Sequence, residues 1–224
     1  MTKFRYIDRG RSEVAVLLSG WATDYRVYSG LNLDYNYLVP ENISLCDFFD
    51  VLYDAIQNYE VCLVGWSFGG VLAADFLVKF PEKIKKAVFC AVKEKYNQSL
   101  IDQTILMIKR NKNAYLKSFY RECLKGHTDD EKQSLSRELI DEYIAKSNED
   151  DLVSKLEYLK NNPLNIEKLK EHEHKITFLY GDKDQVVLLE DSLKLRTHFS
   201  DDCFCEVVNT GHLTFLCPAL KYLI

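Results

Sequence analysis

Short apolar runs alternate with amphipathic segments along most of the chain. Runs rich in β-branched and aromatic residues predict strands, and apolar positions that recur every three or four residues predict helices. We predict strands at residues 3–7, 14–18, 37–40, 61–64, 84–92, 175–180 and 204–208, and helices at 48–56, 71–79, 189–198 and from 213 onward. Because strands and helices alternate, we expect an α/β protein with a mostly parallel central sheet flanked by helices.

The stretch from residue 94 to residue 173 breaks this alternation. It contains no strand-like run and predicts four amphipathic helices, at residues 100–110, 114–124, 129–147 and 150–160. Thr128 and Glu131 have the spacing of a capping box at the start of the third helix. We therefore expect one domain, in which residues 1–93 and 174–224 form the core and residues 94–173 form an all-helical insertion that covers part of it.

Length and composition narrow the class of protein. With 224 residues, of which 47% are hydrophobic, the chain can bury one sizeable core. No stretch reaches the roughly 18 consecutive apolar residues of a membrane span, and the N-terminus lacks the apolar region of a signal peptide. We expect a cytoplasmic monomer that binds no membrane and, with a net charge of −5, no nucleic acid. The seven cysteines include no Cys-x-x-Cys pair, so we expect reduced thiols.

The sequence Gly65-Trp66-Ser67-Phe68-Gly69 lies where a buried strand must turn directly into a helix. A serine on such a strained turn needs residues without a Cβ two positions before and after it, because the strand and the helix approach closely there. The turn leaves the hydroxyl free near a helix N-terminus, which suits a nucleophile. A glycine-rich loop or a partial phosphate-binding turn is the alternative explanation, and residues elsewhere must decide.

A serine hydroxyl becomes a nucleophile when a base takes its proton, and an acid must orient that base. In a fold of this kind the acid and the base follow the serine in chain order, each in a loop after a strand. Asp184 follows the strand predicted at residues 175–180, and His212 follows the strand predicted at residues 204–208. We therefore predict a triad in which Ser67 is the nucleophile, His212 the base and Asp184 the acid.

Other residues compete for these roles. Asp182 lies directly after a glycine and is better placed to shape the turn than to orient a base. Among the other histidines, His127 joins two predicted helices and His198 lies near a helix C-terminus, where a cation is favoured. His172 and His174 could form a surface metal pair, but we interpret them as solvated charge and predict no metal site.

Two backbone N–H groups are candidates for an oxyanion hole. One belongs to Phe68, the residue after the nucleophile, and the other to Trp21 in the loop after the strand at residues 14–18. That polar loop lies at the carboxyl end of a buried strand, where pockets form in open α/β sheets. Trp21 could also be an ordinary core residue.

The chain resembles the α/β-hydrolase superfamily over nearly its whole length. Three signatures carry this resemblance: Gly65-Trp-Ser-Phe-Gly-Gly70, Gly181-Asp-Lys-Asp184 and Gly211-His212. Within the superfamily, four features look like the pimeloyl-acyl-carrier-protein methyl ester esterases of biotin synthesis: Gly20-Trp21, Gly65-Trp-Ser67, His212-x-x-Phe215 followed by Pro218, and Leu156-Glu-Tyr-Leu159. Ser19 stands where that group usually has a histidine. The resemblance implies a helical lid, a carboxylic ester as substrate and no cofactor.

Charge is segregated within and beside the insertion. Residues 83–125 carry 11 lysines and arginines against 3 acidic residues, whereas residues 127–173 carry 7 against 13. A basic cluster on the first two predicted helices could dock an acidic acyl carrier protein that delivers its acyl chain to Ser67. A solvated helix face is the alternative. The basic cluster consists of Lys109, Arg110, Lys117 and Arg121.

Together these features predict a serine carboxylesterase, with the pimeloyl methyl ester on its carrier protein as the substrate that the resemblance implies. We expect Trp21 and the insertion residues Leu106, Met107 and Phe119 to line the acyl pocket, although ordinary packing between insertion and core explains the last three as well. Two other functions stay open. One is a carboxylesterase or thioesterase for small acyl substrates, and the other is a binding protein that uses the pocket without turnover.

Overall fold

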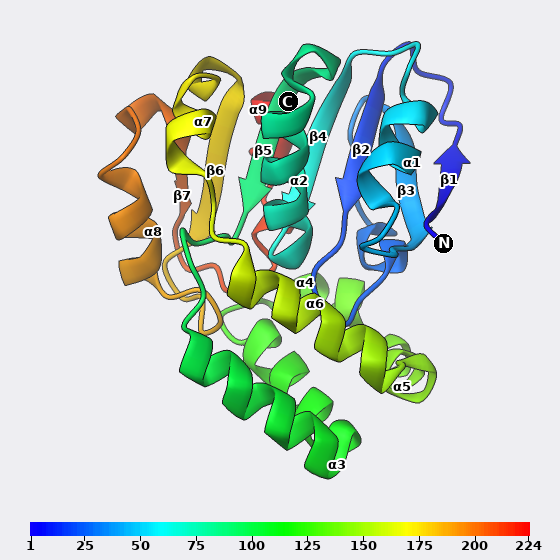
Figure 1. Cartoon of the computed structure of the whole chain (residues 1–224), viewed down its shortest axis with the longest axis vertical. Helices are drawn as coiled ribbons and strands as arrows, with labels where there is room; N and C mark the ends of the chain where they lie inside the picture. The colour runs from blue at the N-terminus through cyan, green and yellow to red at the C-terminus, as the bar shows by residue number, and fades with distance from the viewer.

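A seven-stranded sheet forms the centre of the protein (Figure 1). The structure is a computed structural model and describes residues 1–224. The strands are β1 (Lys3–Ile7), β2 (Val14–Leu18), β3 (Asn36–Asn42), β4 (Val61–Trp66), β5 (Ile84–Cys90), β6 (Ile176–Gly181) and β7 (Phe204–Val207). All seven predicted strands are present, with ends that lie within about two residues of those expected. The predicted α/β class is confirmed.

The strands are arranged in the order β1-β3-β2-β4-β5-β6-β7. β1 pairs with β3 in the antiparallel direction, and every other neighbouring pair is parallel. Since β3 lies between β1 and β2, the turn at residues 8–11 joins two strands that do not pair. Because six strands run in one direction, their carboxyl ends share one edge of the sheet, and the loops at that edge can meet.

Nine α-helices pack against the sheet or lie beyond its edges. They are α1 (Phe48–Ala55), α2 (Phe68–Lys79), α3 (Gln98–Leu124), α4 (Asp129–Lys132), α5 (Arg137–Lys146), α6 (Glu149–Asn161), α7 (Ile166–Lys170), α8 (Leu189–Arg196) and α9 (Leu220–Leu223). Most residues of α2 are apolar and buried, and the helix packs on β4 and β5, so it is a buried helix. None of the seven cysteines forms a disulfide.

The longest helix, α3, replaces two separate predicted helices. The expected segments at residues 100–110 and 114–124 are its two halves, and they meet at a bend where Asn111 has φ −161° and ψ 84°. The side-chain oxygen of Asn111 accepts the backbone N–H of Ala114 at 3.0 Å, as an N-cap residue does. The bend therefore has a local cause in the asparagine that starts the second half.

The prediction of one continuous helix over residues 129–147 was wrong. The capping box of Thr128 and Glu131 is present, but it starts only the short helix α4. Ser136 then acts as a second N-cap, because its hydroxyl accepts the backbone N–H of Leu139 at 3.3 Å and α5 begins there. A serine inside a helical pattern can offer the backbone this alternative, and here the cap prevails.

The start of α1 has no side-chain cap. Asp47 precedes the helix but makes no capping bond with its side chain. Its two carboxylate oxygens instead accept the backbone N–H of Thr2, at 3.0 and 3.2 Å. Asp47 therefore ties the N-terminal segment to the helix rather than capping the helix itself.

The helices α3 to α6 lie together beyond the carboxyl ends of the parallel strands, and we call this layer the lid (Figure 1). Within the lid α3 packs on α5 and α6, and α6 also reaches α2 of the core. α7 packs on α2 and lies beside the sheet. Neither α3 nor any shorter helix combines the length and the apolar character that crossing a membrane requires.

Candidate active site

Ser67 lies between β4 and α2 in a strained backbone conformation. Its φ of 54° and ψ of −117° fall outside the regions that residues with a side chain normally adopt. Its backbone N–H donates to the carbonyl of Cys90 at 2.8 Å, and its own carbonyl accepts the N–H groups of Gly70 and Val71. The main chain is thus held by β5 and α2, while the serine side chain makes no capping bond to the helix.

Strain is concentrated at the edge of the sheet where Ser67 lies. The other non-glycine residues with positive φ are Ala22, Ala91 and Asn209, with values of 61°, 52° and 57°. They lie in the segments that follow β2, β5 and β7. Unfavourable backbone geometry persists where the surrounding structure enforces it, and it clusters at functional sites.

Two glycines allow the turn at Ser67 to be this tight. A Cβ at Gly65 would lie only 2.8 Å from the Cβ of Ala73 in α2. A Cβ at Gly69 would lie 2.6 Å from the carbonyl oxygen of Ser19 and would collide with that of Leu18. The glycine spacing therefore serves close packing between the turn, the helix and the end of β2.

Asp184 and His212 are in direct contact. The Oδ2 atom of Asp184 lies 2.8 Å from Nδ1 of His212, and both side chains are buried. The other carboxylate oxygen accepts the backbone N–H groups of Val186 and Val187, at 2.7 and 2.9 Å, which fixes the orientation of the acid. Nε2 of His212 is buried without a hydrogen-bond partner, so it makes no hydrogen bond to Ser67. Such bonds often tighten only when substrate binds.

The competing residues take structural positions. Asp182 accepts the backbone N–H of Thr210 at 3.2 Å and so joins the loop after β6 to the loop after β7. Nε2 of His198 lies 3.3 Å from a carboxylate oxygen of Glu94 at the surface. No cluster of three or more histidine, cysteine, aspartate or glutamate side chains has the arrangement of a metal site.

Trp66 connects the turn at Ser67 to the loop that carries His212. Its indole Nε1 donates to the carbonyl of His212 at 2.8 Å, and its ring lies against the rings of His212 and Phe215 at centroid distances of 5.3 and 5.0 Å. A Cβ at Gly20 would come within 2.9 Å of the same indole. Trp66 thus fills the space between three loops of the site.

The loop after β2 brings Trp21 to the same edge. The indole of Trp21 is buried, donates to the carbonyl of Leu152 in the lid at 2.9 Å, and meets the ring of Phe119 edge-on at 5.0 Å. The backbone N–H groups of Trp21 and Phe68 make no backbone hydrogen bond. Ser19 lies in the same loop, and its hydroxyl donates to the carbonyl of Thr23 at 3.3 Å.

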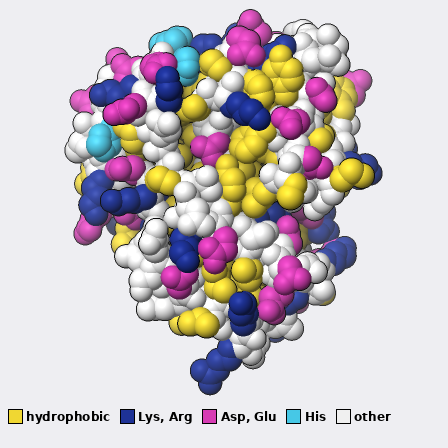
Figure 2. Space-filling model, viewed as in Figure 1, with side chains coloured by type: hydrophobic (Ala, Val, Ile, Leu, Met, Phe, Trp, Pro, Cys, Tyr) yellow, Lys and Arg dark blue, Asp and Glu magenta, His cyan; other side chains and the backbone are white.

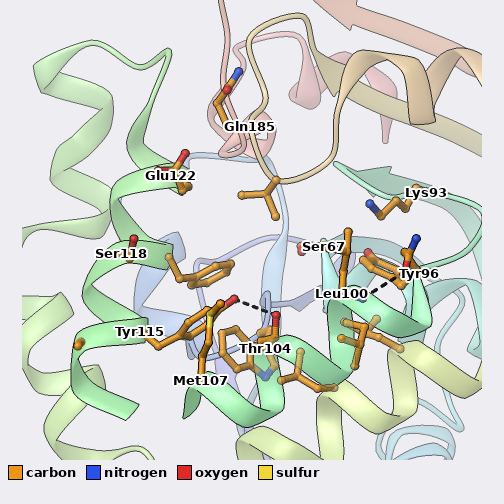
Figure 3. Close-up of a pocket in the computed structure, with 18 of the residues that line it drawn as sticks. Ser67, Lys93, Tyr96, Leu100, Thr104, Met107, Tyr115, Ser118, Glu122 and Gln185 are labelled. Carbon is orange, nitrogen blue, oxygen red and sulfur yellow. Dashed lines mark hydrogen bonds between the residues drawn. The ribbon is translucent and has the colours of Figure 1, made fainter. Parts of the chain in front are cut away.

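A pocket of about 590 Å³ lies beside Ser67, between the core and the lid (Figure 3). Lys93 and Tyr96, from the segment after β5, lie on one side of it. Tyr115 and Glu122, from the second half of α3, lie on the opposite side. Most of the lining is hydrophobic, and the volume is in the range of pockets that enclose a small organic ligand.

The pocket also contains polar groups. Lys93 Nζ pairs with Asp191 at 3.1 Å and lies 5.2 Å from the centre of the Tyr96 ring. The Tyr96 hydroxyl is buried without a hydrogen-bond partner, and this burial raises its pKa above the usual value. The hydroxyls of Thr104 and Tyr115 are 3.2 Å apart and connect the two halves of α3 across the pocket (Figure 3).

Three of the four residues predicted to line the pocket do so, namely Trp21, Met107 and Phe119. The prediction for Leu106 was wrong, because its side chain is 66% exposed and lies outside the pocket. Successive residues of a helix point about 100° apart, so Leu106 faces solvent where Met107 faces the cavity. Of the basic cluster, Arg110 also borders the pocket.

Several pocket residues were not predicted from the sequence. Lys93, Tyr96 and Gln185 follow the ends of β5 and β6, so the rule that ligands bind beyond strand ends could have found them. Tyr115 had no such signal, because its place depends on the bend of α3 at Asn111.

Residues 10–139 of the chain match the family model described as alpha/beta hydrolase fold. The chain belongs to the α/β hydrolase family. The matched stretch of this α/β hydrolase contains Ser67 and much of the lid, whereas Asp184 and His212 follow it.

A curated relative is an uncharacterized carboxylesterase, nap, of Bacillus subtilis (strain 168), which is 29% identical over 85 residues. That match covers 35% of this chain and only 28% of the relative's length.

Solved structures resemble this α/β hydrolase along its whole length. MGS-M2, an α/β hydrolase from a Medee basin deep-sea metagenome library, has a TM-score of 0.77 at 14% identity, over 99% of this chain and 91% of its own. An esterase from Exiguobacterium antarcticum has a TM-score of 0.75 at 19% identity, over 99% and 93%. At such low identities the likeness shows the fold.

Proposed function

We propose that this α/β hydrolase is a serine carboxylesterase. The observation that carries the proposal is the buried contact of 2.8 Å between Asp184 and His212, at the sheet edge where Ser67 is held in a strained turn. The free Nε2 of His212 is the group that would accept the serine proton. Esterases among the similar proteins support the choice of ester over other acyl substrates.

In the proposed reaction Ser67 Oγ attacks the carbonyl carbon of the ester while His212 Nε2 takes the hydroxyl proton. The bond between that carbon and the alcohol oxygen then breaks, and the alcohol leaves with the proton from His212. Water attacks the acyl-enzyme in the same way and releases the acid. Asp184 keeps the proton of the neutral imidazole on Nδ1 and stabilises the charged imidazolium.

The backbone N–H groups of Trp21 and Phe68 are the proposed oxyanion hole. Neither has a backbone acceptor, and Phe68 is the first residue of α2, where N–H groups point out of the helix. Donors held in place before the reaction stabilise the negative charge without reorganisation. The packing of the turn on the end of β2, through Gly69, fixes the distance between the two segments.

For the substrate we propose the ester that the resemblance implies, a pimeloyl methyl ester carried by an acyl carrier protein. The mostly apolar pocket beneath the lid supports an acyl chain as ligand. Lys109, Arg110, Lys117 and Arg121 are exposed and make no ion pair, and basic side chains project from the lower end of the molecule where α3 lies (Figure 2). An acidic carrier would be attracted to this surface.

A fluorophosphonate probe tests the reaction class. We expect it to label the wild type covalently and to leave Ser67→Ala unlabelled, whereas Ser192→Ala, which removes a buried serine of α8, should be labelled normally. Ester hydrolysis should fall with Ser67→Ala by a factor on the order of 10⁵. An unlabelled, folded wild type would point to the binding protein without turnover.

Growth rescue tests the substrate. We expect the gene to restore growth without biotin to a strain that lacks its own pimeloyl methyl ester esterase, and Ser67→Ala to fail. If the wild type hydrolyses small esters but does not rescue growth, the carrier-linked substrate is wrong and the protein is an esterase for small acyl substrates.

A further inference from the structure

One buried histidine of the lid contacts the loop that carries His212. His127 lies between α3 and α4, and its side chain is completely buried. Its Nε2 accepts the backbone N–H of Leu213 at 2.9 Å. Because Leu213 is the next residue after His212, this bond holds the peptide group beside the proposed base.

That peptide group is held from two sides. Its carbonyl, which belongs to His212, accepts the indole N–H of Trp66 at 2.8 Å, and its N–H, which belongs to Leu213, donates to His127. Trp66 is part of β4 and His127 is part of the lid. The core and the lid therefore fix the main chain of His212 together.

The backbones around this bond are in close contact. Gly126 has φ 76°, and a Cβ there would lie 2.8 Å from the Cβ of Lys183. A Cβ at Gly211 would collide with the carbonyl of Lys125 and would lie 2.9 Å from Nε2 of His127. The end of α3 thus packs directly against the loops that carry the proposed acid and base.

The protonation state of His127 suits its role as acceptor. Nε2 can accept a hydrogen bond only when the ring is neutral with its proton on Nδ1. Nδ1 lies 3.5 Å from a carboxylate oxygen of Glu131, and the backbone N–H of Thr128 donates to that same oxygen at 2.8 Å. Nδ1 makes no hydrogen bond, but the nearby negative charge of the carboxylate favours a proton on it. Burial holds the pKa of His127 below its usual value, so the ring stays neutral near pH 7.

We propose that His127 is a positioning residue, which fixes the backbone of His212 from the lid and thereby sets how fast Ser67 is activated. The inference rests on the proposed function. Without the acceptor, the buried N–H of Leu213 is unsatisfied and the peptide group is free to turn. Since a displacement of about 1 Å in a catalytic group can cost about 100-fold in rate, we expect kcat to fall while KM, which the pocket determines, stays.

The test compares His127→Leu, which removes the acceptor, with His127→Gln, whose side-chain oxygen can take the place of Nε2. Tyr158→Phe is the matched control, because it removes another bond between lid and core, that of Tyr158 to Asp75 at 2.6 Å. We expect His127→Leu to slow fluorophosphonate labelling and kcat about tenfold or more, with KM within about twofold. His127→Gln should recover to within about threefold of wild type, and Tyr158→Phe should stay within about twofold.

Labelling of His127→Leu at the wild-type rate would overturn the proposal, and so would equal losses in all three variants, because a loosened lid then explains them. If His127→Leu does not fold, His127→Asn replaces it, since its shorter amide leaves the place of Nε2 empty. Hydrogen exchange at the Leu213 amide measures the bond without any activity. Exchange should accelerate in His127→Leu and not in His127→Gln, even if the wild type proves unreactive and the proposed function fails.

Discussion

The turn at Ser67 and the lid contribute to one pocket in different ways. Nine of the twelve residues of α2 are buried, and main-chain packing leaves no room for a methyl group at Gly65 or Gly69. Only six of the 27 residues of α3 are buried, and the pocket wall there consists of side chains. The position of Ser67 is therefore set by backbone contacts that tolerate little change, whereas the pocket wall that the lid provides depends on the choice of side chains.

Gly69→Ala should have the largest effect, because the new Cβ would collide with the carbonyl of Leu18. We expect a loss of about 3 kcal/mol in the free energy of unfolding, measured by urea denaturation. Gly30→Ala is the control, since nothing lies within 4 Å of a Cβ there, and it should change stability by less than about 0.5 kcal/mol. Equal stability of the two variants would contradict the view that main-chain packing fixes the turn.

Charge reversal on the lid tests its exposed side. We expect the triple change Lys109→Glu, Lys117→Glu and Arg121→Glu to raise KM for a carrier-linked ester about tenfold at low salt and to leave a small soluble ester within about twofold. Arg110 is left intact because it borders the pocket.

The matched control reverses three exposed lysines that lie outside the lid helices α3 to α6. These are Lys170, Lys194 and Lys221. If both triple variants raise KM for the carrier-linked ester equally, overall charge explains the effect, and the basic cluster is not a docking surface.

Asp75 of α2 tests the joint between core and lid. The carboxylate of Asp75 accepts a hydrogen bond from the hydroxyl of Tyr158 in α6. Burial raises the pKa of Asp75 to about 6. Because the unfolded pKa is near 3.9, the folded state binds the proton more tightly, and stability falls as pH rises from about 4 to about 6. Asp75→Asn should therefore raise the unfolding free energy at pH 8 by about 1 kcal/mol and show little gain at pH 4.

Urea denaturation at both pH values checks this prediction. Asp50→Asn, at an exposed position that pairs with Lys79, is the control and should not show the same change with pH. A gain for Asp75→Asn that is equal at pH 4 and pH 8 would argue against a carboxyl group with a raised pKa.

Phe119→Ala should have the smallest effect. The ring of Phe119 lies edge-on to Trp21 and borders the pocket, so its removal enlarges the space for the substrate. We expect the ratio of kcat/KM between a bulky and a short acyl ester to rise on the order of threefold. Leu106→Ala, at the exposed position outside the pocket, should leave that ratio unchanged.

The core could be predicted from the sequence because its signals are local. Each strand is an apolar run, and Asp184 and His212 stand out because each follows one of these runs at the same edge of the sheet. Ser67 was marked by the glycines that its turn requires. No tertiary information was needed to predict that Asp184 and His212 meet at the sheet edge where the strand before Ser67 also ends.

The lid was less predictable because the ends of its helices depend on competing caps, and its packing depends on residues that are distant in the sequence. Ser136 interrupts a helical pattern only because its cap outweighs continued helix there. The Leu106 side chain is exposed because of the way α3 lies on the core. His127 carries no local signal in the sequence, because its partner Leu213 lies 86 residues further along the chain.

The bend at Asn111 gives the pocket one adjustable joint. A straight helix of 27 residues would be about 40 Å long, and only one end of it would lie near Ser67. With the bend, both halves face the same cavity and are joined by the hydroxyls of Thr104 and Tyr115. A residue inserted or deleted at this joint would change the width of the cavity in a single evolutionary step, and Ser67, Asp184 and His212 would be left untouched.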